Sequence, residues 1–598
     1  MFWNQSFILT ASLFERLLAI TNILCFVSSF IQYRGLYSSK GILPVKETIN
    51  KIFLRDIHWW EVPTICRWYH SDKVLELLHY IGIINSLLAF FGICPGLTLL
   101  LSGLCYQSLK NVAGPFLGLQ MHANLIETNY LYSLTSPFIA ASPLPLIIIQ
   151  WSLLSRVMLG GAIGKFCGGD KSWKDLTAMS YHYWTQPLPN PLSPYFHRMP
   201  MIVHKIESLL TFITEGIGAI AVWSPWQFGR MIAFLCFLSI LLMINISGNF
   251  GHLGLLTMVE SVTLLNDDIW LKLLNQLPFN NQIVSFLYFT WNSPFCLSRI
   301  LQLDKLFSFT LLNLTPYLLV VIPYQIFGLV PFISTFGHHT PLTLLSPITG
   351  DKPIEIYNSL KTLPLLKPFF TFCQFIYNFA LHYHPYVHSF DLCCRYVKFG
   401  HMTKRRWEII LEGSNNKTDW IEYDFKAKPN INKSPPILFN HIPMLDWRLW
   451  FLPNEFARGI PPPKWFIMLM KKLSENEKCV LALMGKIPFE FQHKPPKYIR
   501  ALLYDYRFTY KSEQDEKERK RIYLKEKQSQ ANLNEKEEIK TSTSKNDKED
   551  FQLPPINKND YWYRLQFIDQ YGPTITGPIQ SPAESESDDD SDDENKEL

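Results

Sequence analysis

The chain has 598 residues, of which 48% are hydrophobic and 15% aromatic, and its net charge is +5. Its apolar residues are concentrated in residues 1–400, in runs as long as the roughly 20 residues that span a bilayer, and this excludes an ordinary soluble protein. No basic patch interleaved with aromatic residues indicates nucleic-acid binding. The composition therefore predicts a multi-pass membrane protein with a soluble part.

The first apolar run, about residues 7–33, is predicted to be a signal anchor, because no small-residue cleavage pattern follows it. Further apolar runs continue to about residue 388, several of them interrupted by Pro or Gly. They predict about eight to ten transmembrane helices. Residues 1–394 are therefore expected to form a polytopic α-helical membrane domain. The short loops show no clean Lys/Arg asymmetry, so these residues leave the orientation open.

A polar, proline-rich segment, SYHYWTQPLPNPLSPYFHRMP (Ser180 to Pro200), lies between apolar runs. The four prolines from Pro187 to Pro194 disfavour a regular helix. Its Tyr, Trp and His rings suit the headgroup region of a bilayer. No HExxH, no GxSxG and no second His at i+4 marks a catalytic or metal site around His182. We expect a stiff interfacial segment that fixes the angle between two helices.

Several polar residues lie in or beside the apolar runs. Two explanations are open: a substrate site or proton path that lines a cavity, or hydrogen bonds that fix helix packing, at about 0.6 kcal/mol each. We favour the structural explanation, because no catalytic constellation, metal-ligand spacing or cofactor motif is visible. The residues concerned are Gln120, Glu127, His182, Gln186, Glu215, Asn249, Asp267 and Asp268.

A membrane-embedded enzyme or transporter is the alternative function, and it makes a geometric demand. Its residues would be Glu127, His182, Gln186, Glu215 and Asp267. They would have to converge around one cavity, within about one hydrogen-bond length of each other. The 11 cysteines form no CxxC motif, so a thioredoxin-type centre and a cysteine-based zinc site are not expected.

The second half of the chain is predicted to contain a small soluble β-rich domain, sandwich-like, over residues 395–510. The segment Trp407 to Phe425 has strand-like residues on both sides of the polar turn GSNNKT, which predicts a hairpin. PPILFNH and IPFEF are expected to be further short strands, and ENEKCVLALMGK a short helix.

The remaining soluble segments differ strongly in charge. Residues 511–550 mix both signs and are expected to be a disordered insert, and the acidic residues 576–598 a disordered tail. Residues 551–575 are expected to return and pack on the soluble domain. A scaffold whose acidic tail binds calcium or partners is a third possible function.

Arg156 to Pro200, RVMLGGAIGKFCGGDKSWKDLTAMSYHYWTQPLPNPLSPYFHRMP, resembles the signature region of the lipase maturation factors. GNFGHLGLLTMVESVTLLNDD (Gly248 to Asp268) and WIEYDFKAKP (Trp420 to Pro429) resemble further blocks of that family. The resemblance covers nearly the whole chain apart from the insert and the tail. Met121–His122 and Trp184 depart from the family pattern. The membrane core leans toward factor 1, but the paralogue is not assigned.

The resemblance implies a chaperone-like membrane protein of the endoplasmic reticulum, multi-pass, with a lumenal C-terminal domain. Its partners would be the lipid bilayer and secreted homodimeric lipases, such as lipoprotein lipase, which it would help to fold and assemble. No catalysis and no cofactor are implied. LDWRLWF supplies Asp446, Trp447 and Trp450, either as client-binding residues or as core packing.

Two short motifs bear on the compartment. Asn416-Lys-Thr is an N-glycosylation sequon in the predicted hairpin turn, whereas the sequon at Asn245 lies inside an apolar run. The C-terminal NKEL resembles the retrieval signal KDEL at two of four positions.

Overall fold

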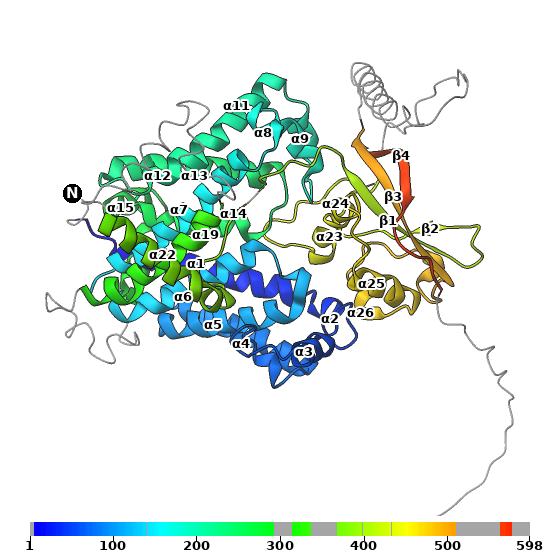
Figure 1. Cartoon of the computed structure of the whole chain (residues 1–598), viewed down its shortest axis with the longest axis horizontal. Helices are drawn as coiled ribbons and strands as arrows, with labels where there is room; N and C mark the ends of the chain where they lie inside the picture. Colours follow the sequence, from blue (N-terminus) through cyan, green and yellow to red (C-terminus); the bar gives the residue numbers. More distant parts are fainter. Residues whose placement is uncertain are drawn as a thin grey trace, which may run out of the picture.

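The computed structural model describes residues 5–139, 141–291, 314–335, 367–397, 399–431, 433–509 and 562–576. A helical domain occupies one side of the molecule and a smaller domain with a β-sheet the other (Figure 1). The predicted insert 511–550 and the tail 576–598, apart from Thr576, lie outside the described residues.

The helical domain carries the long apolar segments of the chain. Four of its described helices, α1, α4, α7 and α13, are long and apolar enough to cross a membrane. The described helices therefore support a membrane domain, but they do not confirm the predicted eight to ten spans. Its main elements are α1 (Ile8–Phe30), α2 (Tyr33–Leu36), α3 (Val45–Leu54), α4 (Asp72–Phe90), α5 (Pro95–Ala113), α6 (Gln120–Ile139), α7 (Leu144–Cys167), α8 (Lys171–Lys174), α9 (Ala178–Thr185), α10 (Ser193–His197), α11 (Met201–Phe212), the π-helix η4 (Ile213–Gly218), α12 (Ala219–Ala221), α13 (Gln227–Ser247), α14 (His252–Ser261), α15 (Asp267–Leu274), α16 (Asn280–Trp291), the π-helix η7 (Tyr317–Val321), α19 (Ile322–Thr335) and α22 (Lys367–Ser389).

Local sequence signals explain where several of these helices begin. Ser71 caps α4, since its hydroxyl accepts a hydrogen bond from the backbone N–H of Val74. Pro95 occupies the first turn of α5, where a missing N–H costs nothing. Asn266 caps α15 through Ile269 in the same way as Ser71. These caps fix the directions of the chain between the apolar segments.

The smaller domain is built around one antiparallel sheet. The strands lie in the order β2-β1-β3-β4, and β5 pairs with β3. The predicted hairpin around GSNNKT is confirmed, because β1 and β2 pair antiparallel across it. The elements are β1 (Trp407–Ser414), β2 (Ile421–Glu422), α23 (Met444–Leu449), α24 (Leu452–Phe456), α25 (Lys464–Ser474), α26 (Lys478–Leu481), β3 (Tyr498–Phe508), β4 (Trp562–Gln570) and β5 (Ile575–Thr576).

The expectation of a β-sandwich is wrong for the part of this domain that the structure describes. Its one sheet packs against helices, α25 in contact with β3 and β5, rather than against a second sheet (Figure 1). PPILFNH contains no strand and IPFEF ends in a short 3-10 helix, Phe489–Phe491. Prolines in both segments remove backbone donors that a strand ladder needs. The short helix expected in ENEKCVLALMGK is found as α26.

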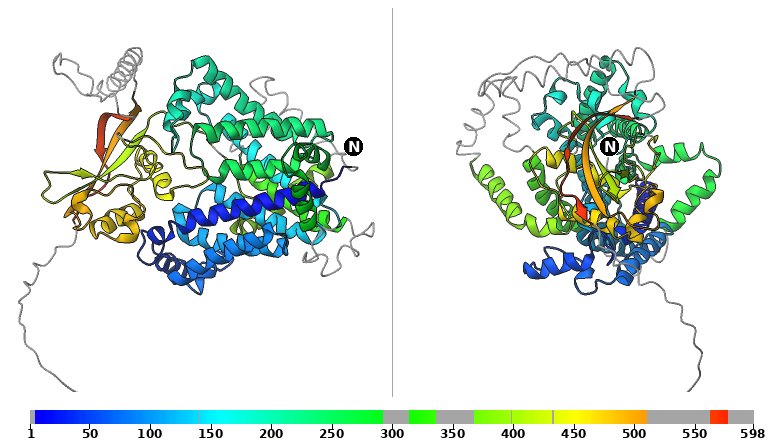
Figure 2. Two further views of the ribbon diagram at one scale, coloured as in Figure 1. Left: turned by 180° about the vertical axis from the view of Figure 1, so that it is seen from behind. Right: turned by 90° about the vertical axis from the view of Figure 1, so that its right-hand side faces the viewer.

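The two domains share one hydrophobic core. The largest cluster of buried apolar residues runs from α1, α4, α5 and α6 into α23, α25, β1 and β3. Phe116 of the helical domain packs edge-on against Trp465 of α25, with ring centroids 5.4 Å apart. Gly35 lies so close to α26 that an added Cβ would sit 2.4 Å from the Cys479 carbonyl oxygen. The domains therefore form one continuous body, seen from two further sides in Figure 2.

Candidate functional site at the domain junction

The polar segment Ser180 to Pro200 lies at the junction of the two domains. Its first residues complete the helix α9, and Pro194 stands in the first turn of α10, so the non-helical residues are 186–192 and 198–200. The four prolines from Pro187 to Pro194 were expected to disfavour a regular helix, and the exception is Pro194. The structure differs because proline is tolerated in the first helical turn. We call residues 178–200 the belt.

The belt is bound to the connection between α13 and α14. The Gln186 side-chain amide donates hydrogen bonds to the Ser193 hydroxyl (2.9 Å) and to the Ser247 carbonyl oxygen (2.8 Å). Pro189 forms an isolated antiparallel bridge with Gly248. These contacts hold the segment against the α13–α14 connection, as a stiff interfacial segment would require.

Asn249 joins three separate parts of the chain. Its side-chain amide donates to the carbonyl oxygens of Pro189 (3.1 Å) and Pro436 (2.8 Å). Its side-chain oxygen accepts from the backbone N–H of Leu438 (3.0 Å). Its backbone N–H donates to Leu188. One buried side chain thus holds the belt, the α13–α14 connection and the C-terminal domain together.

Arg406, just before β1, is the main polar anchor of the C-terminal domain on the belt. Its guanidinium donates to the carbonyl oxygens of Trp184, Gln186 and Pro187, and it is fully buried. Glu408 supplies the counter-charge at 2.8 Å and is itself bound by Lys428 at 2.8 Å. Burial lowers the pKa of Arg406 from its ordinary value, against the carboxylate of Glu408.

Apolar contacts close the same junction. Trp184 of the belt is buried in a cluster with Ile410, Tyr506, Phe508 and Trp562 from β1, β3 and β4. The departure from the family pattern at Trp184 therefore fills a space between the belt and the sheet. Trp450 of the C-terminal domain donates its indole N–H to the Thr185 carbonyl oxygen at 2.8 Å.

Asp446 and Trp447 lie inside the protein, not on its surface. Their exposed fractions are 1% and 6%. Trp447 packs edge-on against Phe250 of the helical domain, with ring centroids 6.0 Å apart. Because both side chains are buried, they offer no surface to a client, and the prediction that they bind one is replaced by the alternative of core packing. Trp450 is partly buried and committed to the belt.

Asp446 has a defined structural task. Its carboxylate accepts the backbone N–H groups of Ala427 (2.6 Å) and Lys428 (3.1 Å), which turns the chain after β2. Burial raises the pKa of Asp446 to about 6, although these two hydrogen bonds and the Lys428 ammonium act in the opposite direction.

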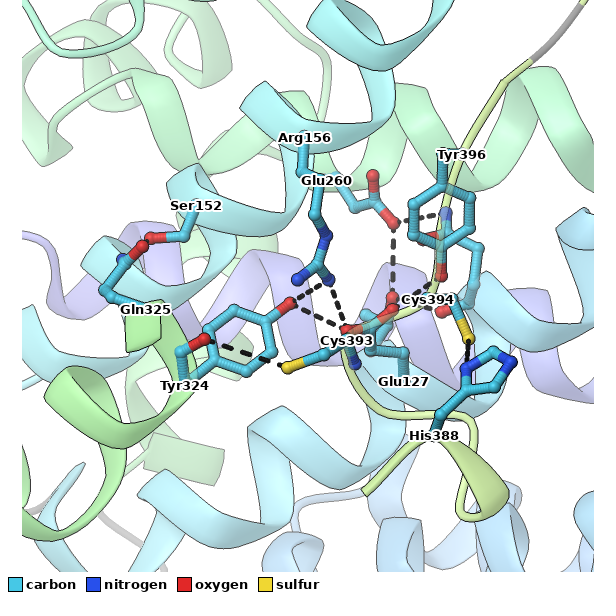
Figure 3. A network of polar contacts seen from close by, with 12 residues as sticks. Glu127, Ser152, Arg156, Glu260, Tyr324, Gln325, His388, Cys393, Cys394 and Tyr396 are labelled. Carbon is cyan, nitrogen blue, oxygen red and sulfur yellow. Dashed lines mark hydrogen bonds and ion pairs between the residues drawn. The ribbon is translucent and has the colours of Figure 1, made fainter. Parts of the chain in front are cut away.

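Glu127 of α6 is the centre of a second polar network, inside the helical domain (Figure 3). It forms an ion pair with Arg156 of α7. It accepts hydrogen bonds from the hydroxyls of Tyr324 (2.8 Å) and Tyr396 (2.6 Å) and from the backbone N–H of Cys393 (2.7 Å). It thus binds α6, α7, α19 and the segment after α22 to one carboxylate.

The other predicted polar residues have contacts of their own, apart from the Glu127 network. Glu215 pairs with Lys165 at 2.6 Å. Asp267 accepts the backbone N–H (2.9 Å) and hydroxyl (3.0 Å) of Thr10, which holds the start of α1. His182 stacks on Phe250, with ring centroids 5.8 Å apart. Gln120 and Asp268 are exposed.

His182 and Glu215 line one cavity, but Glu127, Gln186 and Asp267 lie outside it, so the five residues do not converge as the enzyme or transporter alternative requires. Glu127, Gln186, Glu215 and Asp267 each bond to a different set of partners. Within the described ranges, no group of three His, Cys, Asp or Glu side chains could hold a metal ion. The structural explanation is favoured, and the enzyme or transporter is not.

Sequence reasoning missed three cations that organise these sites. Arg156 and Lys165 both stand in the apolar helix α7, where buried charges normally pair. That rule predicts partners but cannot select Glu127 and Glu215 among several carboxylates. Arg406 lies in the basic run HMTKRRW, where nothing distinguishes it from its exposed neighbour Lys404.

The sequon residue Asn416 is exposed in the turn between β1 and β2. Asn245, by contrast, lies within α13, where its side-chain amide donates to the Leu241 carbonyl oxygen at 2.7 Å. Asn416 is the more exposed of these two sites.

The comparisons with known proteins point to the same family in both domains of the chain. Residues 9–272 match the lipase maturation factor transmembrane domain, and residues 392–531 match the lipase maturation factor C-terminal domain. Lipase maturation factor 2 of Rattus norvegicus is 27% identical, over 84% of this chain and 80% of its own length. Lipase maturation factor 1 of Homo sapiens is 27% identical, over 84% of each chain.

Lipase maturation factor 1 of Bos taurus is 26% identical, over 84% of this chain and 85% of its own length. Factors 1 and 2 match about equally, so the leaning of the membrane core toward factor 1 stays a prediction. No solved structure matches. With the two domains of one family in the expected order, and relatives that align over more than four-fifths of its length, the chain belongs to the lipase maturation factor family.

Proposed function

We propose that this protein is a maturation factor that helps secreted homodimeric lipases to fold and assemble into their active form. The observation that carries the proposal is the match of both family domains and of relatives named lipase maturation factors. The absence of convergence among the intramembrane polar residues favours a chaperone role over catalysis, so we propose that the protein is not an enzyme.

The proposed location is the membrane of the endoplasmic reticulum, with several spans and the C-terminal domain in the lumen. The four long apolar helices support the membrane part. The exposed sequon at Asn416 supports the lumenal side for the turn between β1 and β2. The proposed domain limits are 1–394 for the membrane domain and 395–510 for the lumenal domain, with residues 551–575 returning to it through β4.

The C-terminal domain offers apolar side chains that a folding lipase could contact. Phe439 is 84% exposed, Phe489 is 78% exposed and Phe567 is 55% exposed. Folding intermediates expose apolar surface, and aromatic side chains are frequent anchors of protein interfaces. In place of Asp446 and Trp447, we propose these three aromatic residues as client contacts.

The junction gives this domain a fixed position above the membrane. Arg406, Asn249 and Trp184 all bond or pack across it. A domain held at several points cannot swing freely, so its aromatic side chains face a client in a constant geometry. Less ordering is then needed when a client binds.

The test is rescue of lipase maturation in cells that lack their own factor and secrete a homodimeric lipase. Secreted activity and secreted lipase mass are both measured. The proposal expects the full chain to raise activity per mass well above the vector control. An unchanged activity per mass, with the chain present in the endoplasmic reticulum, would refute the lipase role.

A further inference from the structure

A cavity of about 340 Å³ lies inside the helical domain, beneath the belt. It is bounded by α7, α9, α11, η4, α13 and α14, and its size is in the range of small-molecule pockets. Most of its walls are apolar, with Met158, Ile244, Phe250 and Leu253 among them. The walls therefore suit a hydrocarbon ligand.

The cavity reaches the outer surface between α11 and α13. Its lining includes Leu210, Ile213 and Met243, which are 52%, 37% and 41% exposed. Helix α13 is one of the four candidate spans, and only 22% of its most apolar window is buried. The outward faces of these helices thus carry the apolar side chains that contact a bilayer. With α13 spanning a bilayer, the groups next to this opening are lipid acyl chains.

The charged groups that line the cavity, Lys165, Glu215 and Glu207, are already paired. Lys165 binds both carboxylate oxygens of Glu215, at 2.8 and 2.6 Å. The Lys165 ammonium also lies 5.3 Å from the centre of the Trp173 ring. Because the pair is neutral as a whole, it offers no uncompensated charge that would select a charged ligand. The cavity therefore favours an uncharged chain over an anion or a cation.

Two local features of the backbone, the π-helix η4 and Gly161, form one wall of this cavity. Glu215 lies in the π-helix η4, a local widening that is frequent at functional sites. Gly161 of α7 faces it, and an added Cβ would lie 3.0 Å from the Glu215 carboxylate oxygen. The glycine thus leaves room for the ion pair beside the cavity.

We propose that this cavity binds one acyl chain of a lipid, which enters from the bilayer between α11 and α13. Hydrocarbon in the cavity gains dispersion contacts with its apolar walls. At its inner end the chain touches His182 and Phe250, which belong to or support the belt. Occupancy therefore stabilises the junction from below. The proposal is independent of the lipase role.

The test uses two tryptophan variants with a matched control for each. Met243→Trp and Ser239→Trp place a large ring at the opening, where both side chains are exposed. Leu242→Trp and Leu235→Trp place the same ring at exposed positions of α13 that do not line the cavity, 43% and 53% exposed. All four positions are exposed, so the variants are expected to fold.

The purified full chain is reconstituted in phosphatidylcholine vesicles with a photoactivatable probe, and the labelled peptides are identified by mass spectrometry. One arm uses phosphatidylcholine with a diazirine in its acyl chain, and the other uses a diazirine fatty acid. The result expected is labelling of cavity-lining residues of α7 or α14, reduced at least fivefold in the opening variants and unchanged in the controls.

The two arms identify the source of the chain. Labelling by the phosphatidylcholine probe assigns the acyl chain to a membrane phospholipid, and labelling by the fatty acid alone assigns it to a free acid. Labelling confined to outward-facing residues, or equal labelling of cavity residues in the opening and control variants, would overturn the proposal. Neither result depends on whether the protein matures lipases.

Discussion

The guanidinium of Arg406 lies 3.0 Å from the carbonyl oxygen of Trp184, 222 residues earlier in the chain. This bond joins the start of the sheet domain to the end of helix α9. The same guanidinium binds the carbonyl oxygens of Gln186 and Pro187. Proline lacks a backbone N–H but keeps its carbonyl oxygen, so a proline-rich segment has more hydrogen-bond acceptors than donors. The buried guanidinium of Arg406 supplies the missing donors.

Replacement of Arg406 by methionine is expected to destabilise the protein by roughly 3–5 kcal/mol, because three buried carbonyl groups lose their donor and Glu408 keeps only Lys428 as a partner. Thermal melting of the full chain in detergent measures the effect. The matched control is Arg448→Met, whose pair with Glu455 is partly exposed. The control is expected to cost about 1 kcal/mol or less. Equal losses of stability in the two variants would show that Arg406 is not the main anchor of the C-terminal domain on the belt.

The Glu127–Arg156 pair predicts a non-additive response. Glu127→Leu leaves the buried Arg156 without its counter-charge and should cost roughly 3–5 kcal/mol. Adding Arg156→Met removes the unpaired charge, so the double variant should be more stable than Glu127→Leu alone. A double-mutant cycle on melting curves tests this. As a control, Lys471→Ala breaks an exposed pair and should change stability by less than about 0.5 kcal/mol. Strictly additive losses would contradict the account.

Asp446 predicts a pH dependence of stability. Its folded-state pKa, about 6, lies above the ordinary value of 3.8, so the folded protein holds this proton more tightly than the unfolded chain. The stabilisation from the protonated carboxyl is complete below about pH 4 and is lost as the pH rises through about 6. Relative to Asp446→Asn, the wild type should lose about 2.4 kcal/mol of stability between pH 4 and pH 7.

Melting curves of both proteins across this pH range provide the measurement for Asp446. The comparison with Asp446→Asn removes the contributions of the other titrating groups, which the two proteins share. A difference in stability that stays constant from pH 4 to pH 7 would show that Asp446 is charged in the folded protein at both ends.

The exposed turn between β1 and β2 predicts a glycan. Asn416→Gln should reduce the mobility shift on treatment with an N-glycosidase, since Asn416 is exposed and followed by Lys-Thr, and Asn416→Gln combined with Asn432→Gln removes both sequons of this domain. Asn245→Gln should leave the shift unchanged, because that amide bonds within α13. The assay is gel electrophoresis of the protein from mammalian cells. A wild-type protein without any shift would argue against a lumenal position for this turn.

If the exposed aromatic residues of the C-terminal domain contact a client, their replacement should lower lipase maturation without destabilising the protein. Phe439→Ser and Phe489→Ser should lower the specific activity of a secreted lipase several-fold, while the melting temperature changes little, because both rings are largely exposed. Leu54→Ser, 85% exposed on the helical domain, is the control and should preserve activity. Full lipase maturation by the double Phe variant would exclude these residues as client contacts.

Much of the fold could be predicted from the sequence, because length and hydropathy alone select the candidate spans α1, α4, α7 and α13. The hairpin was also predictable, since a polar turn separates two strand-like segments. Helix α25 was missed, although Trp465, Phe466, Leu469, Met470 and Leu473 follow a helical period. Pro463 directly precedes its first turn, where a proline does not prevent a helix.

The candidate site was less predictable, because its bonds join distant segments. The partners of Asn249 are 60 and 187–189 residues away. Spacing along a sequence carries no information on such pairs, and a burial rule predicts only that partners exist. The belt was recognised as stiff and structural, but its contact with the sheet could not be foreseen without the fold.

The most direct test of the account is the specific activity of a secreted homodimeric lipase in cells that lack their own maturation factor. The full chain is compared with an empty vector, and lipase mass is quantified beside activity. The account predicts that the chain raises activity per unit of lipase mass. Normal lipase mass with activity at the vector level, despite the protein in the endoplasmic reticulum, would contradict it.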